Sequence, residues 1–359
     1  AGYVGDNARF NSLAPVNPRT VQAVARALGY LQDAEAVDLL AETLRTHSRV
    51  ETGNLFLAEA AAEALGRIGN PLAEAELIDV FAGLEDYPRH AYWYGDHEAL
   101  MACHAAPIHY FIIQSLDAIG STKAAAIIPH LIRSIPVDPD RALFSENDDY
   151  ETLTGRVIRR QGAEPSVVET CLAILGDADA HPNEEVRTAL SSIHRCWGGH
   201  PTPEHRAAQV LSCVCRDREY APRIAAAFER CRAKDPPINR VFDKGIPVVE
   251  VLPDKHWICF YLARAMGNLG DPRCEETLIA ALRDSAPEAA GGHPDPLGPG
   301  VLFLHNDLTP CWRAAVAWAV GRTDHPERTS VLFETVSNLA NATDTRHAVT
   351  NLAQSALPR

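Results

Sequence analysis

No apolar run in the sequence approaches the roughly 18 residues that a membrane-spanning helix needs. The chain also lacks a dense run of Lys and Arg, and its net charge of -14 at pH 7 would repel a phosphate backbone. These absences predict a chain without a membrane span that does not bind nucleic acid.

Signature motifs of familiar enzymes are missing as well. The sequence has no P-loop, no G-x-G-x-x-G, no G-x-S-x-G elbow and no H-E-x-x-H pair. A self-contained enzyme of a familiar class normally carries one of them. We therefore expect the chain by itself to be non-catalytic and to hold no cofactor of its own.

The cysteines do not form the pattern of a small disulfide-rich secreted domain. There are nine, an odd number, and several occupy apolar positions in helix-like segments: Cys171, Cys213, Cys259 and Cys274. Buried free thiols are typical of a reducing compartment, so the expected location is the cytoplasm.

What the sequence does contain is a repeat. The stretch ARALGYLQDAEAVDLLAETL at 25–44 returns as ARAMGNLGDPRCEETLIAAL at 263–282. An apolar residue stands directly before each of seven anchors: Gly29, Gly66, Gly120, Gly176, Cys215, Gly267 and Gly321. Gly directly after an apolar-periodic segment is typical of the left-handed residue that ends a helix. Four residues that follow can then cap a second helix, namely Asp33, Asn70, Asp271 and Asp324. Each unit is predicted to be a helix, a tight turn and a helix.

Such helix pairs bury their apolar faces by stacking on their neighbours. We therefore predict an all-α fold, an alpha-solenoid of about seven helix pairs over residues 18–359, after an N-terminal extension at 1–17. Four junctions are longer than the others and predict insertions that share one rim, at about 86–107, 136–164, 234–255 and 285–310. The third carries IPVVEVL at 246–252, which is compatible with short strands or a docking segment.

The turns ALGRIGN at 64–70 and AMGNLGD at 265–271 resemble the ALGxxGD turn of the HEAT-like repeats found in phycobilisome bilin lyases. This resemblance implies a repeat architecture, but not a chemistry, because such repeats occur in enzymes, scaffolds and appended modules. Residues 4–29 resemble the start of the repeat tail of bacterial FAD-dependent oxidoreductases. That second resemblance implies a bacterial protein, with FAD only on a domain outside this chain.

Aromatic and histidine residues gather in and beside the first insertion. Loops held by a rigid scaffold concentrate functional residues, and Tyr and Trp combine a large contact area with polar tips. The cluster is therefore a candidate surface for a partner or ligand, although aromatic residues can also pin an insertion onto its helices. The candidate binding residues are Tyr87, Tyr92, Trp93, Tyr94, His97 and Tyr110.

The same region contains metal-ligand types, namely His97, Glu98, His104 and His109. Their spacing matches no closed zinc pattern. A transition metal held by these residues is a further alternative, and it implies a metal-dependent enzyme that uses the histidine cluster at 90–109.

The leading functional hypothesis is a non-catalytic interaction module. It would present a concave helical surface and a loop rim to a protein partner or an adjoining domain. The alternative hypothesis is that the chain is the helical-repeat portion of a larger enzyme, such as an FAD-dependent oxidoreductase.

Overall fold

The computed structural model describes residues 18–48, 54–84, 97–135, 148–191, 202–233, 238–243, 246–251, 254–283 and 312–340. The chain divides into two compact units, one formed by residues 1–136 and 149–163, the other by residues 137–148 and 164–359. Each is described by itself, and the single solenoid predicted for 18–359 stays a prediction.

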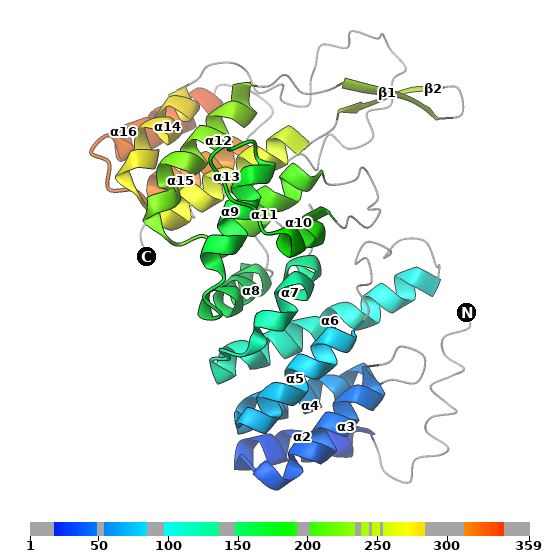
Figure 1. Ribbon diagram of the computed structural model, residues 1–359. Coiled ribbons are helices and arrows are strands. Elements are labelled where there is room, and N and C mark those ends of the chain that lie inside the picture. Colours follow the sequence, from blue (N-terminus) through cyan, green and yellow to red (C-terminus); the bar gives the residue numbers. More distant parts are fainter. Residues whose placement is uncertain are drawn as a thin grey trace. The chain divides into compact units, whose positions relative to one another are not determined.

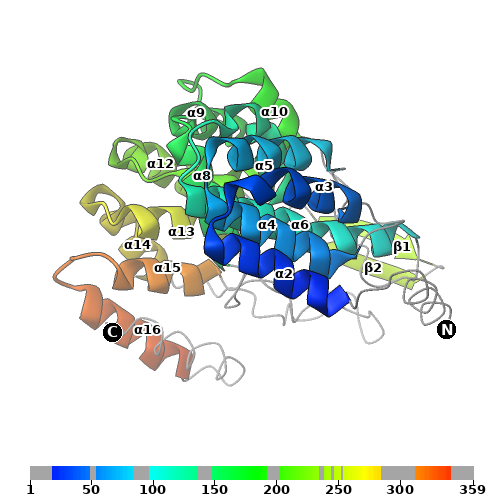
Figure 2. The same ribbon diagram turned by 90° about the horizontal axis from the view of Figure 1, so that it is seen from below.

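Unit 1 is a stack of helix pairs in two layers (Figure 1). Its first layer packs α2 on α4 and α4 on α6, which lie side by side in Figure 2. In its second layer, α3 packs on α5, and α5 on η3. The elements are α2 (Pro18–Leu31), η1 (Ala34–Ala36), α3 (Val37–His47), α4 (Leu55–Ile68), α5 (Pro71–Gly83), α6 (His97–Ile119), η3 (Ala124–Ile127), α7 (Ile128–Ser134) and α8 (Asp148–Arg160).

Unit 2 repeats this arrangement. The helices α9, α11, α13 and α15 pack in succession, while α12, α14 and α16 form the second layer. Its elements are α9 (Glu164–Ile174), α10 (Glu184–Ser191), α11 (Pro203–Val214), η5 (Arg218–Tyr220), α12 (Ala221–Ala233), β1 (Ile238–Asp243), β2 (Ile246–Val251), α13 (Asp254–Leu269), α14 (Pro272–Arg283), α15 (Trp312–Gly321) and α16 (Arg328–Ala340). The predicted alpha-solenoid class is confirmed.

One hairpin departs from the helical pattern. β1 and β2 pair antiparallel, with Val241 opposite Val248. The pair lies within the predicted insertion at 234–255, in a stretch rich in β-branched residues, which favour a pleated strand. A short-strand interpretation of IPVVEVL is therefore correct for 246–251.

Three of the four predicted starts of second helices are correct. Asp324 is the exception, because α16 begins four residues further on, at Arg328. The side chain of Asn70 accepts a hydrogen bond from the backbone N–H of Ala73 at 2.7 Å, and Pro71 fills the first helical position of α5. Asp33 caps η1 in the same manner. The side chain of Asp271 accepts from the backbone N–H of Arg273 at 2.9 Å.

The role predicted for the anchor glycines is wrong for Gly29, Gly66 and Gly267. These glycines lie inside α2, α4 and α13 rather than at the ends of the helices. The left-handed conformation occurs three positions later, at Gln32 with a φ of 52°, at Gly69 with a φ of 62° and at Gly270 with a φ of 55°. Both kinds of glycine follow apolar helical residues, which is why the pattern confuses them.

Gly29 instead permits close helix contact. An added Cβ would lie 2.6 Å from the Cα of Ala64 in α4. The same holds for Gly267, where a Cβ would lie 2.9 Å from the Cα of Ala319 in α15. Ala64 and Ala319 lie two places before the anchors Gly66 and Gly321. Each of these small residues packs closely against the anchor glycine of the preceding unit.

The third predicted anchor, Gly120, is three residues too far along the chain. Gly120 has a φ of 73° and follows the end of α6, so it matches the helix-ending Gly69 rather than Gly66. The residue of α6 that matches Gly66 is therefore Asp117. A Cβ on Gly66 would lie 2.6 Å from the Cβ of Ser115, two residues before Asp117. The contact therefore continues between α4 and α6, with Ser115 in the place of the alanine.

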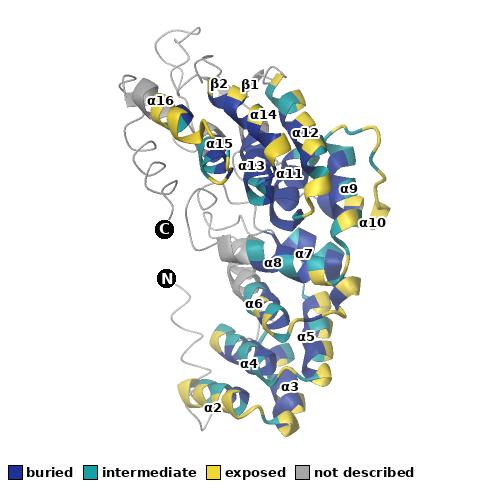
Figure 3. Cartoon of the chain, turned by 90° about the vertical axis from the view of Figure 1, so that its left-hand side faces the viewer, coloured by how far each residue is buried: buried dark blue, intermediate teal, exposed yellow. Residues whose placement is uncertain are grey.

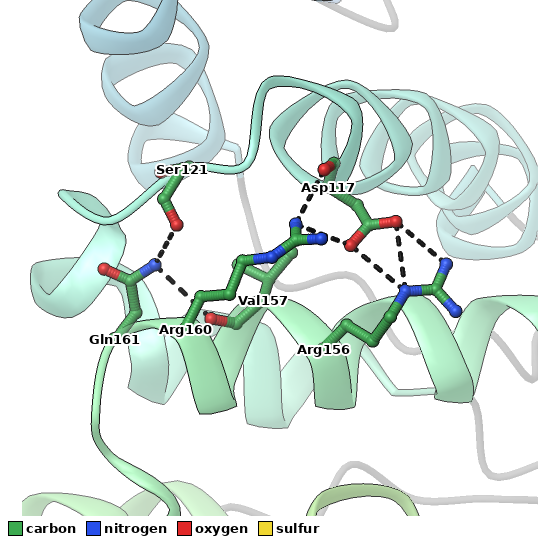
Figure 4. Close-up of polar contacts among 6 residues, drawn as sticks. All are labelled: Asp117, Ser121, Arg156, Val157, Arg160 and Gln161. Atoms are coloured by element: carbon green, nitrogen blue, oxygen red, sulfur yellow. Dashed lines mark hydrogen bonds and ion pairs between the residues drawn. The ribbon is translucent and has the colours of Figure 1, made fainter.

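Helix α8 lies inside the segment 136–164, which the sequence predicts to be an insertion rather than a repeat helix. It packs beside α6 through Asp117, whose carboxylate accepts from Arg156 Nη2 and Arg160 Nη1 at 2.8 Å each (Figure 4). Gln161 adds a hydrogen bond to the carbonyl of Ser121 at 2.8 Å. Charged residues replace the apolar-small-Gly pattern here, so the repeat pattern does not indicate this helix. The first predicted insertion, 86–107, likewise extends too far, since α6 begins at His97.

Candidate interaction surface

An apolar face of α2 is open to solvent. The exposed fraction is 53% for Val24 and 76% for Leu31. Five exposed residues recur at helical spacing and therefore share one side of the helix, which is yellow in Figure 3: Thr20, Ala23, Val24, Ala27 and Leu31. We call these five residues the α2 outer face.

The matching positions of α4 are covered. Helices α2 and α4 both have 14 residues, and placing Gly29 on Gly66 aligns them end to end. In this alignment the first four residues of the α2 outer face match Leu57, Ala60, Ala61 and Ala64, all of which are buried. Ala64 packs against Gly29, so these residues form the side of α4 that lies against α2. The α2 outer face thus has the position of a repeat interface without a described neighbour on it.

The backbone of α2 allows the same close approach that α4 shows. Ala27 matches Ala64, the residue that receives Gly29 from the neighbouring helix. A small residue at this point lets two helix backbones come nearer than larger side chains would permit. The surface can therefore accommodate a helix that presents Gly or Ala at the crossing.

The adjoining second helix extends this surface. Leu39 of α3 is 64% exposed. Its counterpart one unit later is Glu76 of α5, which forms an ion pair with Arg45 of α3. Leu39 thus occupies the position that, one unit later, contacts the preceding second helix.

Ion pairs hold α2 on the opposite side. Arg26 reaches Glu59 at 3.1 Å and Glu63 at 3.0 Å, both on α4. Burial raises the pKa of Glu59, against the opposing effect of the Arg26 charge. Because the Arg26 side chain is 38% exposed, solvent screens the pair and its main effect is to orient α2 on α4.

The residues predicted for the loop rim are only partly described. Tyr87, Tyr92, Trp93 and Tyr94 lie outside the described residues. Tyr110 is half-buried in α6, where its ring meets the edge of Phe111 at 5.5 Å between centroids. The rim surface stays a prediction.

The metal candidates are similarly divided. His97, Glu98 and His104 belong to α6, in a stretch whose side chains lie outside the described part of the structure. His109 is buried, and its ring packs edge-on against Phe81 at 5.1 Å between centroids. Among the described residues, no group of three or more His, Cys, Asp or Glu side chains could hold a metal ion. A site using the undescribed side chains stays a hypothesis.

The fold defines the class of the protein as a helical-repeat protein built from pairs of helices joined by tight turns. Within it, the PBS lyase HEAT-like repeat matches residues 22–46 and 258–284. The first match spans α2 and α3, and the second spans α13 and α14. The chain therefore carries HEAT-like repeats, as the turn sequences indicated.

No curated protein matches the chain. The resemblance of residues 4–29 to FAD-dependent oxidoreductases lies outside what the repeat match tests and stays a hypothesis. Within the described segments, no helix is both long enough and apolar enough to cross a membrane.

Proposed function

We propose that this chain is a non-catalytic HEAT-like interaction module that binds a helix of a protein partner or of an adjoining domain. The observation that carries the proposal is the α2 outer face. It is exposed, while four of the five matching positions of α4 are buried. The HEAT-like repeat matches support the module itself.

The chemistry of the surface favours an apolar helix as the ligand. Covering Val24, Leu31 and Leu39 would contribute on the order of 1 kcal/mol for each side chain, since each is about half to three-quarters exposed. Ala27 would lie at the crossing, where a small residue of the incoming helix gives the closest contact. The proposed interface thus repeats the contact between α2 and α4.

A comparison of variants tests this proposal. The full chain and the double variant Val24→Lys, Leu31→Lys are used to capture proteins from a lysate, and the captured proteins are identified by mass spectrometry. Phe333→Lys is the matched control, because Phe333 is 74% exposed on α16 in unit 2. We expect a partner shared by the parent chain and the control and lost with the double variant. Retention of that partner by a folded double variant would refute the α2 outer face as the interface.

The rim provides a second test. Replacing Tyr92, Trp93 and Tyr94 by Ala should weaken capture if the loop rim adds recognition to the α2 outer face. Unchanged capture together with a lower melting temperature would assign these rings to holding the insertion in place.

A separate protein and an adjoining domain of a longer polypeptide could both supply the helix. The reading frame upstream of Ala1 distinguishes them, and a flavin-binding domain there would support the alternative of a larger FAD-dependent enzyme. We place the protein in the cytoplasm, because the cysteines in the described segments are not joined in disulfides: Cys171, Cys213, Cys215, Cys231, Cys259 and Cys274.

A further inference from the structure

Two thiols of unit 2 are in direct contact. The Sγ of Cys259 in α13 lies 3.5 Å from the Sγ of Cys231 in the last turn of α12. Cys259 is 1% exposed, whereas Cys231 is half-buried, so part of that residue stays in contact with solvent. The pair combines one partly exposed cysteine and one buried cysteine.

The position of the pair in the chain is distinctive. α12 packs on α13, and the segment between them carries the β1–β2 hairpin. A bond between the two sulfurs would close this segment into a loop and tie together the two helices that flank it. It would also link two layers of the same stack, because α12 belongs to the second layer and α13 to the first.

Three of the other four cysteines of the described segments are less suited to reaction. Burial raises the pKa of the Cys215 thiol to about 12 and that of the Cys274 thiol to about 12. Burial also raises the pKa of Cys171. Since the thiolate is the reactive form, these three residues should stay reduced under conditions that oxidise an accessible thiol.

We propose that Cys231 and Cys259 form a reversible disulfide when the protein meets a peroxide. The Cys231 thiolate attacks one oxygen of the peroxide, which yields a sulfenic acid at Cys231 and releases hydroxide. The Cys259 sulfur then attacks the Cys231 sulfur and displaces its hydroxyl group as water, after losing its own proton. Overall, two thiols and one hydrogen peroxide become one disulfide and two waters.

The movement that this step needs is small. A disulfide has an S–S distance of about 2.05 Å, so the sulfurs must approach by about 1.5 Å from their separation of 3.5 Å. Side-chain rotation in one or both cysteines can supply part of that movement, because χ1 moves the sulfur without moving the backbone. A disulfide that closes the segment from Cys231 to Cys259 into a loop restricts the unfolded chain. It should therefore raise the melting temperature of unit 2 by about 5 °C or more.

The test treats the folded full chain with hydrogen peroxide, blocks the remaining thiols with N-ethylmaleimide and maps the peptides by non-reducing mass spectrometry. We expect a peptide pair joined through Cys231 and Cys259, two hydrogens lighter than the sum of the reduced peptides, which disappears on reduction with dithiothreitol. Cys231→Ser and Cys259→Ala should each abolish it. Cys274→Ser, at a buried cysteine elsewhere in unit 2, should keep it.

Two results would overturn the proposal. One is over-oxidation of Cys231 to the sulfinic acid while Cys259 still reacts with N-ethylmaleimide after unfolding. The other is a disulfide that joins Cys231 to a different cysteine or to a second chain. Circular dichroism of each variant shows whether the variant is folded. If a variant does not fold, the peptide map of the unmutated chain still shows whether the Cys231–Cys259 disulfide forms.

Discussion

Replacing Gly29 by Ala should weaken the packing of α2 on α4. The added Cβ would lie 2.6 Å from the Cα and 2.9 Å from the Cβ of Ala64. Favourable carbon contacts lie at about 3.5–4.0 Å, so the two helices must separate by roughly 1 Å. The nearest atom belongs to the backbone and cannot rotate away.

The size of the effect follows from two opposing contributions. Overpacking of a tight contact costs about 1–3 kcal/mol, and a gap of about 1 Å also removes a large part of the dispersion energy along the interface. Ala in place of a helical Gly recovers about 1 kcal/mol through helix propensity. We therefore expect a net loss of about 2 kcal/mol, which lowers the melting temperature of unit 1 by roughly 4–8 °C.

Gly83→Ala is the matched control in the same unit. Gly83 ends α5, its φ is not positive and an added Cβ would meet nothing within 4 Å. This variant should be neutral or up to about 1 kcal/mol more stable. Urea unfolding followed by circular dichroism gives both free energies. Equal stability of the two variants would refute the close-contact role of Gly29.

Three further predictions concern other positions. Gly69→Ala should cost about 1–2 kcal/mol in urea unfolding, because a φ of 62° is strained for Ala, although the added Cβ would make only ordinary contacts, the nearest at 3.6 Å from the Gly66 carbonyl oxygen. An unchanged free energy would exclude that conformation. Asp117→Ala should cost about 1 kcal/mol and speed amide exchange in α8, since Arg156 loses its partner on α6; unaltered exchange in α8 would contradict this anchoring role. Hydrogen bonds from Arg223 lower the pKa of Glu169 in the folded protein below 4.5. The stabilisation that this ion pair gives is therefore complete above about pH 4.5 and is lost as the pH falls through the pKa of Glu169 in the folded protein. Glu169→Gln should make the melting temperature of unit 2 fall less steeply with acid, and an identical fall in the parent chain and the variant would disprove this role.

The sequence was sufficient for the helix pairs whose turns keep the repeat pattern. Asn70 and Asp271 cap as expected, because capping depends on local residue type and spacing. The function of Gly29 could not be predicted, since a close-contact glycine and a helix-ending glycine leave the same local pattern. Only the neighbour across the interface, Ala64, distinguishes them.

The α2 outer face could not be predicted from the sequence either. Val24 and Leu31 look like ordinary core residues in an amphipathic helix, and they are exposed because no described helix packs on that side of α2. An alignment of α2 with α4 could have raised the question, because both helices place small and apolar residues at the same positions. Helix α8 escaped detection because its contact with α6 depends on Arg156 and Asp117 rather than on a small-residue pattern.

Native-state hydrogen exchange tests the central claim, that no other described helix covers the α2 outer face and that it is open to solvent. α4 packs against α2 on one side and α6 on the other, whereas only the α4 side of α2 has a described helix neighbour in the first layer. We predict that amides at 60–65 in α4 exchange at least about ten times more slowly than those at 23–28 in α2. Equal protection of the two helices in the isolated chain would mean that the α2 outer face is already covered, and would contradict the account.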